Sequence, residues 1–207
     1  SVYISDGATV EVRGGITNLG EIAGSDGTLT IARSAQRVAP DVDLNTVMTV
    51  GKGGKGTFNV YGEQMFVGVK SLNVADESTS EGTIEIDGNQ SLVYSEEEVF
   101  FGEGKGKINV LNGGQLESAV QISIDSPLQD GAQVTVTGLG AIPLSHRPSI
   151  NAPRIVVGED GYGKLSLENS GYAGTLPAAL EMMDANCIKA VENWARAASR
   201  WMPAPFS

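Results

Sequence analysis

The chain has 207 residues, with 25 Asp and Glu against 14 Lys and Arg, so its formal net charge is −11. An acidic balance of this kind argues against sequence-independent nucleic-acid binding and against attachment to anionic lipid, because both need basic clusters. Hydrophobic residues make up 41% of the chain, which is enough for a packed core and argues against disorder. The single cysteine, Cys187, excludes a disulfide within the chain.

A short phrase recurs along residues 1–175: a glycine, a small, polar or basic residue, and then an apolar–polar–apolar triplet. Alternation at period two predicts a β-strand with one buried face and one wet face. Two of the copies, at residues 7–12 and 131–136, carry one extra residue. In chain order, the first apolar residues of the triplets are Val10, Leu29, Phe58, Ile84, Ile108, Val134 and Leu165.

The fullest copies, around residues 47–62, 99–117 and 155–171, place an apolar strand and a glycine-rich turn before the triplet. Two or three short strands joined by glycine corners predict one coil of a β-solenoid. No single coil can bury its apolar face, so stacked neighbours must supply the core. We therefore predict an all-β fold for residues 1–175, a right-handed parallel β-helix (β-solenoid) of about seven coils.

The fuller phrase resembles a known repeat, which residues 50–60, 101–114 and 157–167 match best. It is similar to the repeat of autotransporter passenger regions in type V secretion, also called the autotransporter or PEP-CTERM-associated repeat. This resemblance implies a right-handed parallel β-helix exported by a Gram-negative bacterium, either secreted or held at the cell surface. The resemblance implies no particular activity, because such stalks present adhesins, enzymes and toxins alike. It supplies no catalytic motif and no cofactor.

Residues 176–207 follow a different pattern, rich in alanine between positions 177 and 201. Apolar residues recur there at steps of three and four, which predicts an amphipathic α-helix. Pro177 suits the first turn of that helix, and Pro203 lies just beyond its end. Three roles remain open for this C-terminal α-helical segment: a cap over the edge of the last coil, a docking helix for another domain or chain, and a segment foreign to the natural protein.

Two insertions, residues 32–46 and 139–154, lengthen the gaps between copies of the phrase. Long connections project from the side of a solenoid, where binding residues concentrate. Their basic residues stand out in an acidic chain and are our candidate binding residues, with an acidic glycan or a host surface as the ligand. The alternative is an ordinary exposed loop. The candidates are Arg33, Arg37, His146, Arg147 and Arg154.

Other motifs give no catalytic or metal-binding residues. Residues 51–56 match the dinucleotide fingerprint G-x-G-x-x-G, but a strand follows where that fingerprint needs a helix, so we predict a corner turn. Asp recurs before Gly, as at residues 6, 26, 130 and 160, which suits turns better than a calcium array, since the calcium-binding nonapeptide is absent. Glu85 should point outward, but the equivalent neighbours are Asn59 and Asn109, so adjacent coils supply no second carboxyl for glycoside hydrolysis.

These patterns favour a structural or adhesive extracellular rod over an enzyme. We expect a mature chain, or a fragment of a longer secreted bacterial surface protein, that presents loops to a host glycan or protein or associates with itself. No run of 18 apolar residues is present, so we expect no membrane insertion by a helix. The alternatives are a polysaccharide-acting β-helix enzyme (a lyase or a hydrolase), a phage tail-fibre-like rod and a self-associating surface-layer element.

Overall fold

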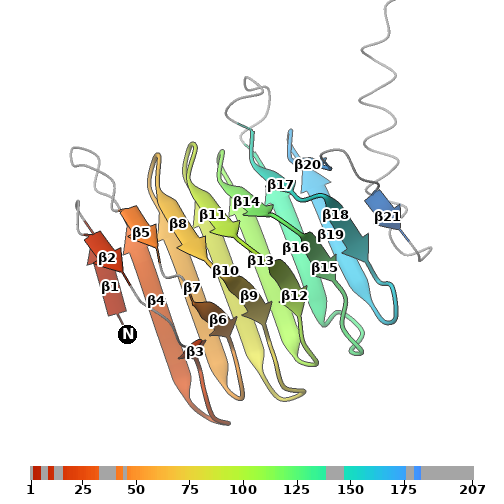
Figure 1. The fold of residues 1–207 in the computed structure, drawn as a ribbon. Coiled ribbons are helices and arrows are strands. Elements are labelled where there is room, and N and C mark those ends of the chain that lie inside the picture. Colours follow the sequence, from red (N-terminus) through yellow and green to blue (C-terminus); the bar gives the residue numbers. More distant parts are fainter. Residues whose placement is uncertain are drawn as a thin grey trace, which may run out of the picture.

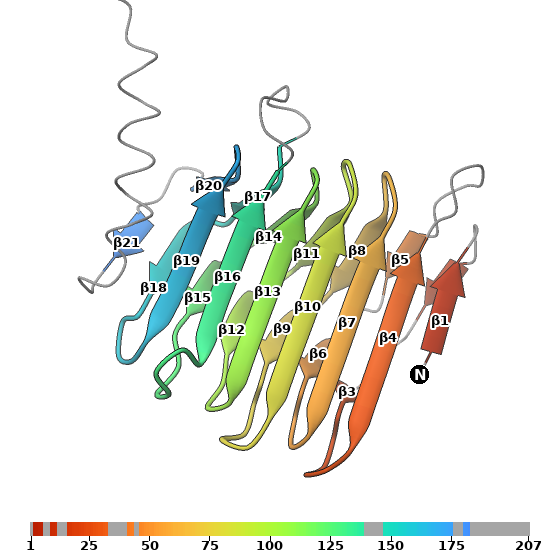
Figure 2. The same cartoon turned by 180° about the vertical axis from the view of Figure 1, so that it is seen from behind.

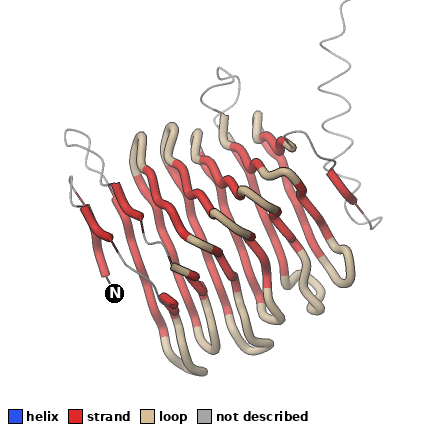
Figure 3. Tube along the Cα trace, viewed as in Figure 1, coloured by secondary structure: helices blue, strands red, loops and turns tan. Residues whose placement is uncertain are grey.

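In the computed structural model, the chain winds into a parallel β-solenoid of about five turns (Figure 1). The structure describes residues 2–5, 9–11, 16–32, 41–43, 46–138, 147–175 and 180–182. Every regular element within these ranges is a strand, as the colouring of Figure 3 shows. The same ranges hold no helix of the length and apolarity needed to cross a membrane. The predicted all-β parallel solenoid is therefore confirmed.

Each turn contributes one strand to each of three sheets, and each sheet contains seven strands. Sheet A, which faces the viewer in Figure 2, has the longest strands. The five turns from β4 to β18 are described over most of their length, and strands of one further turn at each end complete the sheets. The strands of sheet A are β1 (Val2–Ser5), β4 (Asp26–Ala32), β7 (Lys55–Tyr61), β10 (Glu81–Asp87), β13 (Lys105–Leu111), β16 (Ala132–Thr137) and β19 (Gly163–Glu168).

Sheets B and C have strands of three or four residues each. All of their neighbouring strands pair in parallel, as in sheet A. The strands of sheet B are β2 (Thr9–Glu11), β5 (Asp41–Asp43), β8 (Phe66–Val69), β11 (Leu92–Ser95), β14 (Gln115–Ser118), β17 (Ser149–Asn151) and β20 (Tyr172–Gly174). The strands of sheet C are β3 (Ile16–Leu19), β6 (Val47–Val50), β9 (Ser71–Val74), β12 (Glu98–Phe101), β15 (Gln121–Ile124), β18 (Arg154–Val157) and β21 (Leu180–Met182).

The apolar triplet positions form the core, as the alternation predicts. Phe58, Ile84 and Ile108 lie opposite one another on neighbouring strands and are fully buried. Their outward neighbours, such as Asn59 and Glu85, are only partly buried. Six of the seven predicted triplet residues align in this register of sheet A: Leu29, Phe58, Ile84, Ile108, Val134 and Leu165.

The first triplet was assigned wrongly. Val10 lies in β2 of sheet B and pairs with Val42, whereas Val2 of β1 occupies the sheet A position opposite Leu29. Val2 and Ile4 show the same apolar alternation around Tyr3, and Val2 precedes Leu29 by 27 residues, close to the intervals of the later copies. Val10 precedes Leu29 by only 19 residues, too few for the three strands of a turn and their corners.

The start of the predicted C-terminal helix is also wrong. Leu180, Glu181 and Met182 form β21, which pairs with β18 and extends sheet C. The open edge of β18 offers unpaired backbone groups, and a short extended segment satisfies them better than one turn of helix. The helix predicted beyond residue 182 lies outside the described residues.

Small residues occupy the first or second position of the strands β4 to β19 of sheet A. Gly27, Gly56, Gly82, Gly106, Ala132 and Gly163 lie opposite one another. A Cβ added at Gly82 would lie 2.2 Å from the carbonyl oxygen of Val50 and 2.8 Å from the amide nitrogen of Ala75. At Gly82, and likewise at Gly163 through the carbonyl oxygen of Ile124, close approach of the backbone from the turn below therefore excludes a side chain.

Buried hydroxyl groups close the corners between sheets A and B. The Ser91 side chain is fully buried, and its hydroxyl donates to the carbonyl of Gly62 at 2.6 Å. The same oxygen accepts a hydrogen bond from the amide of Met65 at 3.3 Å. One serine thus joins two successive corners where the backbone groups have no ladder partner.

Candidate functional site

The structure describes two of the five candidate basic residues. Arg154 is the first residue of β18 rather than part of a projecting loop. Its guanidinium donates to the Oε1 of Gln121 at 3.0 Å and pairs with the Oε1 of Glu159 at 2.9 Å. Arg147 lies just before β17 and is partly buried. His146, Arg33 and Arg37 lie outside the described residues.

The predicted insertions also contribute to the solenoid itself. Residues 41–43 form β5 and residues 149–151 form β17, so both stretches supply strands to sheet B. Apolar residues here occupy core positions: Val42 and Ile150 are fully buried. Part of each predicted insertion therefore belongs to the coil itself and does not project from it.

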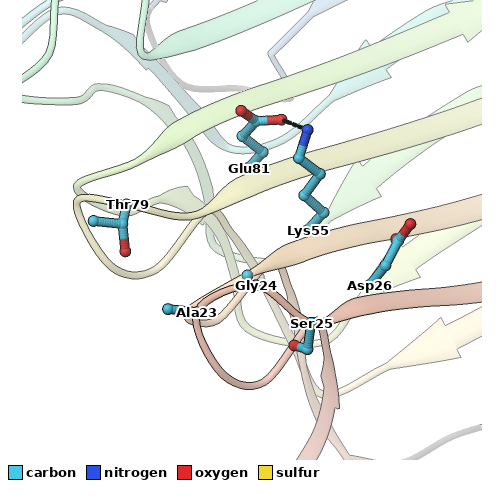
Figure 4. Close-up of a pocket in the computed structure, with 9 residues that line it drawn as sticks. Ala23, Gly24, Ser25, Asp26, Lys55, Thr79 and Glu81 are labelled. Carbon is cyan, nitrogen blue, oxygen red and sulfur yellow. Dashed lines mark ion pairs between the residues drawn. The ribbon is translucent and has the colours of Figure 1, made fainter.

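A pocket of about 370 Å³ lies at the corner between sheets C and A. Stacked corners from successive turns line it, including Ser25, Gly53, Gly54 and Thr79 (Figure 4). A Cβ added at Gly54 would lie 2.4 Å from the carbonyl oxygens of Ile22 and Ser25. The glycines of residues 51–56 thus form a corner followed by strand β7, as predicted, rather than a phosphate-binding turn before a helix.

Three charged side chains project along the rim of this pocket (Figure 4). Asp26, Lys55 and Glu81 begin neighbouring strands of sheet A, and Lys55 pairs with Glu81 at 2.9 Å. The hydrogen bond and charge of Glu81 raise the pKa of Lys55, with a smaller contribution from Asp26. Lys55 in turn lowers the pKa of Glu81. Each of the two side chains therefore favours the charged form of the other.

The same row continues with Lys105, which lies opposite Glu81 on β13. The charges therefore alternate in sign along the solenoid axis: Asp26, Lys55, Glu81, Lys105. Opposite charges directly across a pair of strands stabilise the pairing, whereas like charges there destabilise it. Asp26, Lys55 and Glu81 of this row line the pocket, and their unlike charges favour the pairing of neighbouring turns.

The outer face of sheet A carries two acids on one strand, which the sequence comparison between coils did not reveal. Glu85 and Asp87 of β10 are two residues apart and share the outward face, so their Cα atoms are about 7 Å apart. Burial raises the pKa of Tyr61, and the carboxylate of Glu85, which accepts its hydrogen bond, raises it further. Asn112 donates to Asp87 at 2.7 Å.

This pair lacks the environment of a glycoside hydrolase. Such an enzyme keeps one carboxyl protonated in an apolar setting beside a second, ionised carboxyl. Glu85 and Asp87 are both partly exposed on a sheet face among polar neighbours. The predicted neighbours Asn59 and Asn109 flank Glu85 in register, as expected.

The outer face of sheet B presents aromatic side chains, which the sequence reasoning missed. Tyr94 lies opposite Glu117, Glu117 opposite Asn151, and Asn151 opposite Gly174. The Nδ2 of Asn151 donates to the Oε1 of Glu117 at 3.2 Å. We call Tyr94, Glu117, Asn151 and Tyr172 the tyrosine strip.

Tyr172 leans along its own strand toward Gly174. A Cβ added at Gly174 would lie 2.6 Å from Cε1 of the Tyr172 ring and 3.0 Å from its hydroxyl oxygen. The ring thus occupies the space that a side chain at position 174 would fill, and it remains 45% exposed. The signal in the sequence was Y172-A-G174, an aromatic residue two positions before a glycine on a strand.

Within the described residues, no group of three or more His, Cys, Asp or Glu side chains is placed to hold a metal ion. Asp130, which precedes Gly131, has a positive φ of 60°, as turn residues often do. No family model, no curated protein and no solved structure matches this chain. The geometry and chemistry of its own residues are therefore the basis for any function proposed for it.

Proposed function

We propose that this chain is a structural and adhesive rod of a bacterial surface protein, wound right-handed like the passenger regions of autotransporters. It is secreted or held at the cell surface and presents its faces and connections to a host glycan or protein, or to further copies of itself. The observation that carries this proposal is the unbroken register of sheet A across its seven strands. A solenoid of this kind displays side chains at a fixed spacing of about 4.8 Å along its axis.

Rows of polar side chains on the outer faces support a role in binding extended, repetitive ligands. Along sheet A, one outward row consists of Thr30, Asn59, Glu85, Asn109, Thr135 and Ser166. All of these side chains are partly exposed. Hydroxyl and amide groups donate and accept hydrogen bonds, and the carboxylate of Glu85 accepts them, so this row can bind a polar ligand at the surface.

The connections before β5 and β17 remain the second proposed contact region. Positive charge for an acidic ligand would come from Arg147, which lies just before β17. The other basic residues of the predicted insertions would add to it: His146, Arg33 and Arg37. Arg154 is expected to contribute less, because Glu159 already pairs with its guanidinium.

A glycan and matrix-protein binding array with the purified chain tests the proposal. We expect saturable binding to at least one glycan or matrix protein, and weaker binding of acidic ligands by R147A than by the control K164A, a lysine on the outer face of sheet A. Absence of binding to every array member, with a monomer in sedimentation analysis, would overturn the adhesive role.

A polysaccharide-acting enzyme is the second candidate, and the single observation in its favour is the carboxylate pair of Glu85 and Asp87. If the pair is catalytic, the chain releases reducing ends from a polysaccharide and E85Q abolishes the release. We expect no release from neutral or acidic polysaccharides, since neither carboxyl lies in an apolar setting.

A further inference from the structure

We infer that the tyrosine strip on the outer face of sheet B binds an uncharged glycan chain that lies along the solenoid axis. This inference rests on the proposed function and names the ligand class and the residues for it. The strip comes from four strands that follow one another in sheet B: β11, β14, β17 and β20. Its members lie on the side of the sheet opposite the core residues Val93, Leu116 and Ile150.

The two tyrosines provide flat apolar surfaces with a polar edge. A sugar ring has apolar C–H faces and polar rims, so an aromatic side chain with an exposed face suits it. The ring of Tyr172 is directed along the sheet over Gly174 rather than away from it. Tyr94 lies opposite Gly68 of β8, where no side chain stands beside its ring.

Between the two rings lie the groups that would recognise hydroxyls. Glu117 and Asn151 are hydrogen-bonded to each other at 3.2 Å, which fixes their positions. The Nδ2 of Asn151 also donates to the Oγ of Ser149 at 3.2 Å, so the groups left for the hydroxyls of a sugar are acceptors: the Oδ1 of Asn151 and the carboxylate oxygens of Glu117. A few polar groups placed between apolar surfaces are typical of specific ligand sites.

The dimensions favour a chain over a single sugar. Tyr94 and Gly174 are separated by three strand steps, which is roughly 14 Å along the axis. Leu92 and Phe66 extend the apolar surface beyond Tyr94, and the Phe66 side chain is 39% exposed. An oligosaccharide of several units can therefore contact both rings at once.

Charge selects an uncharged ligand. The strip contains Glu117, and the chain has a net charge of −11. An acidic glycan would be repelled by both, whereas a neutral one meets no such penalty. This separates the strip from the basic connection at Arg147, where an acidic ligand is expected.

The test is calorimetric titration of the full chain with cellohexaose, chitohexaose and mannohexaose as neutral probes and a heparin hexasaccharide as the acidic probe. We expect at least one neutral hexasaccharide to bind. Y94A and Y172A should each weaken that binding about tenfold, as expected for central aromatic contacts. Y94F and Y172F should retain it, because the ring is kept. The matched control is Y162A, since Tyr162 is 46% exposed but lies outside sheet B.

Two results would overturn the inference while leaving the proposed function standing. One is binding of a neutral hexasaccharide that Y94A/Y172A does not weaken, with both proteins showing the same circular dichroism. The other is binding of the heparin hexasaccharide alone, lost in R147A. If no probe binds and the array is also blank, the inference and the adhesive role fail together.

Discussion

Replacement of Gly82 by alanine should destabilise the solenoid although it adds only one methyl group. The new Cβ would lie 2.2 Å from the carbonyl oxygen of Val50 and 2.8 Å from the amide nitrogen of Ala75, both backbone atoms that cannot turn aside. A clash-free alanine would stabilise by about 0.4–1 kcal/mol through the unfolded chain. Overpacking of a rigid site costs about 3 kcal/mol, so the net effect is a loss of about 2 kcal/mol.

The expected loss lowers the melting temperature by about 4–8 °C for a chain of this size. Circular dichroism during heating measures it. G106A is the first comparison: the nearest atom to its Cβ would be Cδ1 of the Phe101 side chain at 2.3 Å, which can move, so a smaller loss is expected. Ala132 fills the same column with a methyl group and is almost fully buried, so A132G should lower stability, not raise it. A G82A protein that melts at or above the wild-type temperature would refute the close-approach argument.

Three further predictions concern the core, the corners and the charged row. I108A should lower the free energy of unfolding by about 2–5 kcal/mol because it leaves a cavity at a fully buried site, whereas N109A on the outer face should change it by no more than about 0.5 kcal/mol. Equal urea midpoints for the two variants would contradict the assigned faces. S91A should cost about 1–3 kcal/mol in the same urea experiment, since it leaves the Gly62 carbonyl and the Met65 amide of the preceding corner without their side-chain partner, and an unchanged midpoint would count against that role. K55A should raise the pKa of Glu81 toward its ordinary value in a carboxyl NMR titration. Because the pKa of Glu81 is lowered in the folded chain, the ion pair contributes stability above the unfolded pKa of Glu81 and loses that contribution as the pH falls through the folded pKa. If the pKa of Glu81 does not move in K55A, the pairing with Lys55 is disproved.

The strands of sheet A could be predicted because three signals coincide in them. A glycine needed for close approach, a period-two alternation and a recurrent spacing all mark the strand that begins at residue 55 and those after it. The first turn escaped this reasoning because Val10 imitates the triplet while the true strand, starting at Val2, lacks the preceding glycine. Pattern alone cannot choose between two alternating stretches when the number of residues per turn varies.

The strands of sheets B and C are harder to predict, since three or four residues give too little alternation to judge. Arg154 illustrates the consequence: its place in the insertion of residues 139–154 suggested a loop, yet it begins β18 together with the apolar run after it. The tyrosine strip could not be predicted either, because Tyr94 and Tyr172 are separated by 78 positions and meet on one face only through the stacking of turns. The acid pair on β10, in contrast, could have been found from the predicted outward direction of Glu85, since Asp87 follows it by two residues on the same strand.

The alternating charges at the start of the sheet A strands give this rod a parity. Removal of one internal turn, residues 55–80, would bring Asp26 opposite Glu81 and place two negative charges side by side. Removal of two turns, residues 55–104, would bring Asp26 opposite Lys105 and keep unlike charges together. Across the four strands from β4 to β13, the solenoid can therefore lose turns with least penalty in pairs, because loss of a single turn sets like charges opposite each other.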